Sequence, residues 1–408
     1  MGSPLEGIRI ADFTHYQAGP VCTLLLQDLG AEVIKVEPLD GEPGRWGGAK
    51  PTSFGESLTF QIHSRGKMSM TVDLTTKAGK EVVADLISVS DVCVENFRPG
   101  SIKRLGFGYD DVCRINPSIV MASISGFGQT GPYSSWPAVD FVAQAMSGLM
   151  EVNGQPGSPP TKYGVEMADY SGGMFGAMSV LGALYRRALT GKGEYIDVAM
   201  LDAMVFQLNY HPIRYKFAGV RYGRTGNRVA GSGTAGAYEC NDGYVALAPG
   251  GDLRWKKLAQ LIGRPDMAED ARYTTVDQRW ELHDEIDDAI EAWSRAQPVK
   301  AAVRQLHEAD QIAGPVNLLP DIFEDEHIKA REMLVEVEHP LHGPLTLPGS
   351  VFKMRDAMLP PVDTAAPLLA EHNGYVLSEL LGYSSDRLRK LERDRIVIAD
   401  TPAALSSD

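Results

Sequence analysis

Short strand-like apolar runs alternate with helical apolar patterns along the first 200 residues of this chain. Strands are expected at residues 7–13, 32–36, 68–74, 91–97 and 119–125, with helices between them at 19–29, 76–89 and 101–115. The strands at 7–13, 68–74 and 91–97 are each followed by a helix long enough to carry the chain back across a sheet. This alternation predicts an α/β fold whose large domain is a Rossmann-like, doubly wound parallel sheet.

The pattern changes beyond residue 205. A small-residue apolar helix is expected at 171–189, a strand at 192–198, a helix at 200–209, a hairpin within 238–248, helices at 253–261 and 282–294, and a charged helix at 384–395. Residues 221–236 are rich in glycine, arginine, serine and threonine, as a linker would be. We expect a large domain at 1–205, a linker at 206–225, a smaller α/β domain at 226–330, and a C-terminal segment at 331–408. That last segment lacks a sheet-sized pattern and is expected to pack back on the large domain.

Composition excludes several classes of partner. The 408 residues carry a net charge of −14 that is spread along the chain, which argues against nucleic acid or an anionic membrane. The first residues show no signal-peptide pattern, and no apolar stretch approaches bilayer length, so we expect a cytoplasmic protein.

Motifs for bound metals and dinucleotides are missing from the sequence. The cysteines are far apart and the nine histidines form no HExxH pattern, so free thiols and no metal site are expected. No GxGxxG follows the first strand, so a nicotinamide or flavin cofactor is not expected either.

Asp169 is the best candidate for a catalytic side chain. It lies at the amino end of the apolar helix expected at 171–189. A carboxylate there is favoured by the helix dipole and can accept backbone hydrogen bonds, which would lower its pKa. Position alone therefore allows two interpretations, a helix N-cap or a nucleophile.

Several motifs resemble those of a known enzyme family. They occupy residues 12–20, 29–37, 94–100, 105–106, 116–117 and 125–128, in this order. Together they resemble the class III coenzyme A (CoA) transferases, the group of formyl-CoA transferase and carnitine CoA-transferase. Asp169 falls where that family has its catalytic aspartate, and the turn Gly191-Lys192-Gly193 follows at the expected interval.

The resemblance implies transfer of CoA from an acyl-CoA donor to a carboxylic acid. A carboxylate in a water-poor site can attack a thioester, and the mixed anhydride then exchanges into an aspartyl-CoA thioester. No metal or redox cofactor is needed. A glycine-rich flap covers the site in the family, and Gly250 and Gly251 are the best match here, although they also fit a tight turn before a helix.

The resemblance also implies a CoA-binding set. Its members are His15, Gln17, Ala18, Val72, Asn96, Phe97 and Arg104. Two groups of them follow predicted parallel strands directly, where open α/β sheets bind ligands. Pro38 and Met68 depart from the family, because relatives often have basic side chains there, so one or two phosphate contacts are in doubt.

Two other functions remain possible. Racemases and epimerases of 2-methylacyl-CoA esters share the fold and use a histidine with an aspartate. Here the corresponding stretch is Ala138-Val139-Asp140, and a valine cannot transfer a proton. The other alternative is a non-catalytic CoA-binding subunit of a hetero-oligomer, against which the retention of Asp169 argues.

The substrates are harder to infer. Four aromatic residues lie in segments that border the active site of relatives, Trp46, Tyr133, Trp136 and Tyr170. They would form an apolar wall or belong to the core. We hypothesise a succinyl-CoA type of donor and a bulky, possibly aryl-substituted acceptor such as benzylsuccinate. The family further implies interlocked, ring-shaped dimers, made of two copies of this chain or of this chain and a homologous one.

Overall fold

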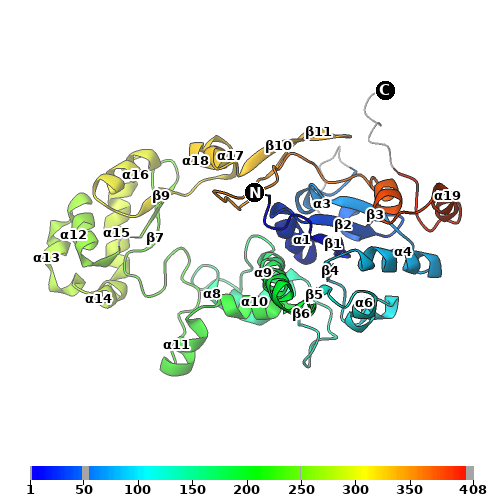
Figure 1. The fold of residues 1–408 in the computed structure, drawn as a ribbon. Helices are drawn as coiled ribbons and strands as arrows, with labels where there is room; N and C mark the ends of the chain where they lie inside the picture. The colour runs from blue at the N-terminus through cyan, green and yellow to red at the C-terminus, as the bar shows by residue number, and fades with distance from the viewer. Residues whose placement is uncertain (1, 48–54, 249, 401–408) are drawn as a thin grey trace. The chain divides into compact units, whose positions relative to one another are not determined.

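The structure is a computed structural model that describes residues 2–47, 55–248 and 250–400. The chain divides into two compact units (Figure 1). The large unit holds the residues up to 149, then 163–209 and those from 327 onward, whereas the small unit holds 150–162 and 210–326. The small unit thus begins earlier than residue 226 and includes a segment that we placed in the large domain.

A six-stranded parallel sheet forms the centre of the large unit, in the order β3-β2-β1-β4-β5-β6. The strands are β1 (Arg9–Asp12), β2 (Glu32–Glu37), β3 (Met68–Thr71), β4 (Val92–Glu95), β5 (Val120–Ser125) and β6 (Glu194–Ala199). The predicted α/β fold with a Rossmann-like sheet is confirmed. This order reverses between β1 and β4, and such a switch point opens a crevice at the carboxyl ends of the strands.

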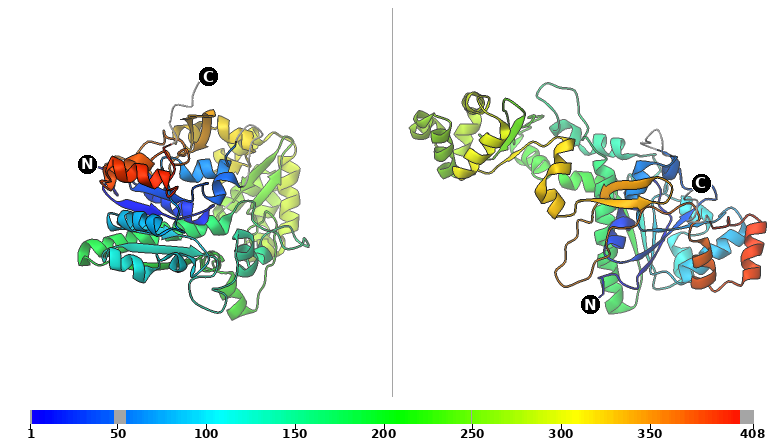
Figure 2. Two further views of the ribbon diagram at one scale, coloured as in Figure 1. Left: turned by 90° about the vertical axis from the view of Figure 1, so that its right-hand side faces the viewer. Right: turned by 90° about the horizontal axis from the view of Figure 1, so that it is seen from above.

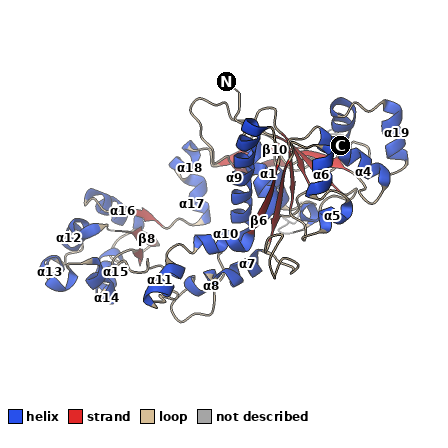
Figure 3. Ribbon diagram, turned by 60° about the horizontal axis from the view of Figure 1, so that its bottom comes forward, coloured by secondary structure: helices blue, strands red, loops and turns tan. Residues whose placement is uncertain are grey.

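Helices cover both faces of this sheet (Figure 3). One face packs on α1 (Ala18–Asp28), α7 (Asp140–Ser147), α9 (Met167–Thr190) and α10 (Met200–Gln207). The other packs on α4 (Lys77–Ser88), α5 (Ser101–Leu105), α6 (Tyr109–Ile115) and α19 (Ser385–Arg393). The single helix expected at 101–115 is therefore wrong, because Gly106 adopts a φ of 95° and ends α5.

The small unit has its own sheet and core. Its strands are β7 (Gly236–Glu239), β8 (Tyr244–Leu247) and β9 (Ala313–Pro315), which pair antiparallel. Its helices include α11 (His211–Ala218), α12 (Gly251–Leu261), α13 (Pro265–Glu269), α14 (Val276–Glu281), α15 (His283–Ser294), α16 (Val299–Glu308) and α17 (Leu319–Glu324). The expected hairpin is present, and the short third strand escaped the sequence pattern because only three residues pair.

The C-terminal segment packs on the large unit, where its helix α19 lies beside N-terminal elements (Figure 2). The side chain of Asn373 binds the backbone N–H of Thr71 at 2.8 Å and its hydroxyl at 3.0 Å, at the edge of the sheet. The segment also contains a hairpin, β10 (Leu334–His339) and β11 (Gly343–Pro348), which the sequence analysis did not expect. Across the described residues, no helix is long and apolar enough to cross a membrane.

Close packing of α9 on α1 depends on glycine. A Cβ at Gly173 would lie 2.7 Å from the carbonyl oxygen of Ala18 and from Cβ of Val21, whereas a Cβ at Gly182 would meet open space among the described residues. We expect Gly173→Ala to lower the free energy of unfolding by about 1–3 kcal/mol. Gly182→Ala, in the same helix, should raise it by about 0.5–1 kcal/mol. Urea unfolding of the two variants tests this difference, and equal effects would contradict it.

Candidate functional site

The turn between β1 and α1 lies at the switch point of the sheet. Asn96, which follows β4, binds it in both directions: the N–H of His15 donates to Oδ1 at 2.7 Å, and Nδ2 donates to the carbonyl of His15 at 2.9 Å. The ring of Phe97 meets the ring of His15 edge to face, at 4.8 Å between centroids. The structure thus brings together five of the seven residues expected to bind CoA: His15, Gln17, Ala18, Asn96 and Phe97.

The His15 ring is neutral at physiological pH. Burial lowers its pKa to about 4, and the ammonium group of Lys35 lowers it in the same direction. A neutral imidazole cannot supply a positive charge to a phosphate. It can make one hydrogen bond as donor and one as acceptor, which suits a positioning role.

The other two residues of the set lie elsewhere. Val72 follows β3, separated from β1 by β2, and its backbone N–H already donates to the carbonyl of Glu37 at 2.9 Å. Arg104 lies on α5 with an exposed side chain whose Nη2 donates to the Ser101 hydroxyl at 2.8 Å.

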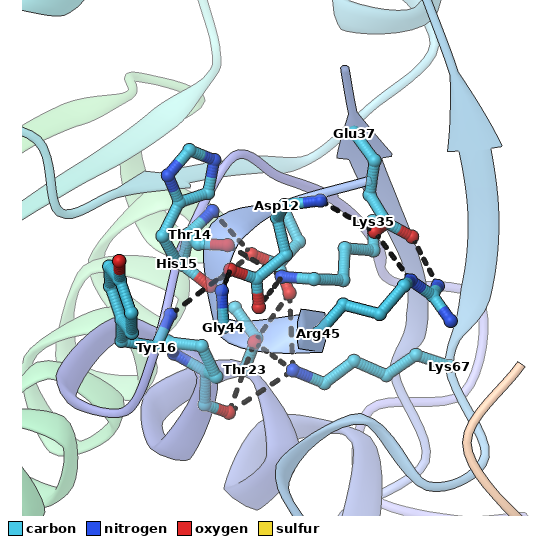
Figure 4. Close-up of polar contacts among 12 residues, drawn as sticks. Asp12, Thr14, His15, Tyr16, Thr23, Lys35, Glu37, Gly44, Arg45 and Lys67 are labelled. Atoms are coloured by element: carbon cyan, nitrogen blue, oxygen red, sulfur yellow. Dashed lines mark hydrogen bonds and ion pairs between the residues drawn. The ribbon is translucent and has the colours of Figure 1, made fainter. Parts of the chain in front are cut away.

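A buried charge network underlies the turn (Figure 4). Asp12 accepts from the N–H of Thr14 at 2.8 Å, from the hydroxyl of Thr23 at 2.8 Å and from Lys67 Nζ at 3.1 Å. Burial alone would raise the pKa of Asp12, but Lys67, Lys35 and the bonds from Thr14 outweigh it and lower the pKa to about 2. Asp12 therefore carries its charge at any physiological pH.

A second part of the network surrounds Arg45. Its guanidinium binds both oxygens of Glu37, at 3.0 and 2.6 Å, and Glu56 at 2.8 Å. These three groups are buried, and the guanidinium also stacks on the ring of Phe60 at 4.0 Å. The shared cation offsets much of the cost of burying the two carboxylates.

Asp169 is the third residue of α9, so it lies inside the first turn and is not the N-cap. The buried Asp140 takes the capping role: its Oδ1 accepts from the N–H of Ala168 at 2.7 Å and of Asp169 at 3.4 Å. Gln144 Nε2 donates to the other Asp140 oxygen at 2.6 Å. Of the two interpretations of Asp169, the helix N-cap is therefore wrong.

The pKa of Asp169 is raised, not lowered as expected. Burial is the largest cause, and the charges of Asp140 and Glu166 add to it, which places the pKa at about 7. The helix N–H groups that would have stabilised its carboxylate are bound to Asp140 instead. Asp169 therefore titrates near neutral pH, as a reactive carboxyl group often does.

The start of α9 is also tied to α3 (Leu58–Ser64). The hydroxyl of Tyr170 lies 3.0 Å from Nε2 of His63, whose pKa burial and Lys67 lower to about 3. A Cβ at Gly173 would meet Ala18, and a Cβ at Gly176 would meet Cys22, so α9 and α1 run in the same direction and their N-terminal turns lie at the same end. The first turn of α9 thus lies beside the His15 turn.

The four aromatic residues proposed for an apolar wall are not core residues. Trp46, Tyr133, Trp136 and Tyr170 have exposed fractions between 36% and 49%. The rings of Tyr133 and Trp136 pack together with centroids 4.2 Å apart.

Gly250 and Gly251 lie in the small unit. Gly250 precedes α12, and Gly251 begins it with a φ of 72°, which only glycine adopts readily. The glycines therefore form a turn before a helix.

Two carboxyl groups escaped the sequence analysis as site residues. Asp140 was considered only as part of a motif that lacks its histidine. No local signal marks its capping role, because it begins α7 but caps α9, 28 residues further on. Glu95 is buried at the end of β4 and accepts from the N–H of Phe97 at 2.8 Å. Burial raises its pKa to about 7.

Comparison with known proteins identifies the family of the chain. Residues 5–373 match the family described as CoA-transferase family III. The chain is 37% identical to a formyl-CoA:oxalate CoA-transferase of Streptomyces avermitilis, over 97% of this chain and 100% of that protein. It is 33% identical to a succinyl-CoA–L-malate CoA-transferase beta subunit of Chloroflexus aurantiacus, over 97% and 98%. A crystal structure of a CaiB/BaiF family protein from Brucella suis matches with a TM-score of 0.83 and 32% identity, covering 93% of this chain and 100% of that one. The chain therefore belongs to the class III CoA-transferases.

Proposed function

We propose that Asp169 is the covalent carrier of CoA between a donor of the succinyl-CoA type and an acceptor carboxylic acid. The observation that carries this proposal is the position of Asp169. Its half-buried side chain lies on the first turn of α9, beside the β1–α1 turn that holds His15, and its pKa is about 7. Burial leaves its ionised form poorly solvated and hence more nucleophilic.

The proposed reaction has four exchanges. The Asp169 carboxylate attacks the donor thioester carbonyl, forms a mixed anhydride and releases CoA thiolate. The thiolate attacks the Asp169 carbonyl, which gives the aspartyl-CoA thioester and frees the donor acid. The acceptor carboxylate attacks that thioester, and the released thiolate then attacks the acceptor carbonyl, which restores the Asp169 carboxylate. Every bond that breaks is replaced, and no net proton is gained or lost.

We propose that the donor's CoA moiety binds to His15, Gln17, Ala18, Asn96 and Phe97, with Val72 and Arg104 as outer contacts. This assignment is supported by the crevice that parallel sheets form at the carboxyl ends of their strands, where the strand order reverses. Arg104 has an exposed guanidinium and can approach a phosphate, whereas neutral His15 can only orient the ligand. Gly250 and Gly251 are proposed as the loop that excludes water.

The pH dependence of transfer should follow Asp169. The reactive form is the carboxylate, so we expect the rate to rise with pH through about 7. Asp140→Asn keeps an oxygen for the helix N–H groups but removes a negative charge, so the rising limb should move to lower pH. Glu166→Gln, which removes a more exposed and weaker contributor, should move it less. A pH–rate profile of kcat/KM with no shift in Asp140→Asn would contradict this assignment.

The acceptor is proposed to be a bulky carboxylic acid, for example an aryl-substituted acid such as benzylsuccinate. The exposed rings of Tyr133, Trp136 and Tyr170 support it, because they are not used by the core. A second candidate is a small dicarboxylic acid, which the names of the oxalate and L-malate relatives favour.

A panel of acids assayed with succinyl-CoA separates the two candidates. Benzylsuccinate and similar acids should give a kcat/KM at least about tenfold above that of oxalate or formate if an apolar wall binds the acceptor. The reverse order would overturn the bulky acceptor and leave CoA transfer intact. Native mass spectrometry would show whether the chain assembles as the proposed interlocked homodimer, or requires a homologous subunit like the relative named as a beta subunit.

A further inference from the structure

The turn after β1 has a backbone conformation that its own sequence does not favour. Tyr16 has a φ of 60°, in the left-handed region that residues with a Cβ adopt rarely. Its side chain is 56% exposed, so packing of the ring does not hold the residue there. The backbone must therefore be held by hydrogen bonds.

Side chains from three separate segments hold that backbone. Lys35 Nζ on β2 donates to the carbonyl of Thr14 at 2.5 Å, and Asn96 binds both polar groups of His15. The N–H of Tyr16 donates to Glu42 Oε2 at 3.3 Å. Consecutive backbone groups from Thr14 to Tyr16 are thus each bound to a side chain.

Glu42 is itself fixed on several sides. Its carboxylate accepts from the N–H of Gly44 at 2.5 Å and lies 3.7 Å from Lys35 Nζ, and both side chains are buried, 1% and 0% exposed. A Cβ at Gly44 would lie 2.8 Å from the Glu42 carboxylate and 2.9 Å from Cα of Tyr16, so the chain there is pressed against the turn. Figure 4 shows Lys35 and Gly44 beside Thr14 and Tyr16. Buried charged side chains therefore hold the backbone of this turn in one conformation.

We propose that Glu42 is a positioning residue for the CoA donor: together with Lys35 it holds the turn from Thr14 to Gln17 in its bound conformation before the donor arrives. A turn ordered in advance loses no conformational freedom on binding, so it strengthens affinity without a new contact. This inference rests on the proposed function, because it assigns the turn to the donor.

The test compares two buried glutamates. Glu42→Gln weakens the acceptor of the Tyr16 N–H and places an amide beside Lys35. Glu56→Gln is the matched control, because Glu56 is also buried and ion-paired. Its partners differ, since it pairs with Arg45 and accepts a hydrogen bond from Gln61. We expect Glu42→Gln to raise the donor KM, and the Kd of free CoA measured by calorimetry, about tenfold with little change in kcat. Glu56→Gln should leave both within about twofold, even where thermal unfolding shows that it destabilises the protein equally.

A second background distinguishes positioning from general destabilisation. Glycine adopts the left-handed conformation without strain, so the turn of the Tyr16→Gly variant should depend less on the hydrogen bond to Glu42. In the Tyr16→Gly background, Glu42→Gln should raise the Kd of CoA by only about threefold instead of tenfold. This comparison requires only a folded protein and calorimetry.

The outcomes separate the inference from the proposed function. If the unaltered protein binds CoA and transfers it, but Glu42→Gln changes the Kd no more than Glu56→Gln, the positioning role is wrong and the transferase assignment stands. The same conclusion follows if the effect of Glu42→Gln is equal in both Tyr16 backgrounds. If the unaltered protein neither binds CoA nor transfers it from any donor, the proposed function fails and the inference fails with it.

Discussion

Asp169→Ala is expected to abolish CoA transfer, with a loss of at least about 10³-fold in kcat. Without this carboxylate no mixed anhydride can form, and the remaining residues can only bind the donor. Incubation with succinyl-CoA should add the mass of CoA less one water to Asp169 in the unaltered protein, and hydroxylamine should convert the adduct to a hydroxamate on the same peptide. Peptide mass spectrometry checks both, and neither species should form in the variant.

The matched control is Asp202→Ala, since Asp202 also lies in the first turn of a helix, α10, with an exposed side chain. It should transfer CoA and form the adduct at Asp169 as the unaltered protein does. The racemase alternative predicts a different result: solvent deuterium would enter the α-carbon of a 2-methylacyl-CoA ester without any adduct. Since Val139 is exposed at the position of the racemase histidine, we expect no such exchange. An active Asp169→Ala protein would overturn the covalent mechanism.

Arg45→Met is expected to destabilise the large unit by about 3–5 kcal/mol. The substitution leaves Glu37 and Glu56 buried without their shared cation, and methionine fills most of the space beside Phe60. Urea unfolding measures the loss. The deficit should shrink as the pH is lowered, because Arg45 holds the pKa of Glu37 down against burial, and an unpaired Glu37 can take up a proton.

Arg114→Met provides the comparison. Arg114 pairs with Asp111 on the surface of α6, where its side chain is 74% exposed. Surface pairs contribute little, so the change in unfolding free energy should stay within about 1 kcal/mol. Similar losses in the two variants would mean that the buried network contributes no more than a surface ion pair.

The sheet of the large unit could be predicted from the sequence because its signals are local. A central strand such as β5 is buried on both faces and therefore appears as a nearly continuous apolar run, as at residues 119–125. The turn that holds His15 and the residues after β4 could be placed at one edge for the same reason. Local pattern could not foresee that Gly106 divides a helix, or that strands as short as β9 would pair.

The chemistry of Asp169 could be inferred only in part. Its place near the start of a helix is local, and its candidate role came from the motifs around it. Its raised pKa depends on Asp140, which lies 29 residues earlier and takes the helix N–H groups that Asp169 was expected to bind. Competition of two carboxylates for the same donors is decided by packing, which the order of residues does not reveal.

Local signals therefore sufficed for the six strands of the large sheet and for the residues that reach its carboxyl edge, since periodicity and turn chemistry act over a few neighbours. The tertiary structure alone decided which charges meet. Lys35, Glu42 and Asn96 come from separate segments and converge on a backbone turn that Tyr16 does not favour. The strength of each contact depends on burial, because charges attract strongly only where water is excluded, and burial is a property of the folded chain.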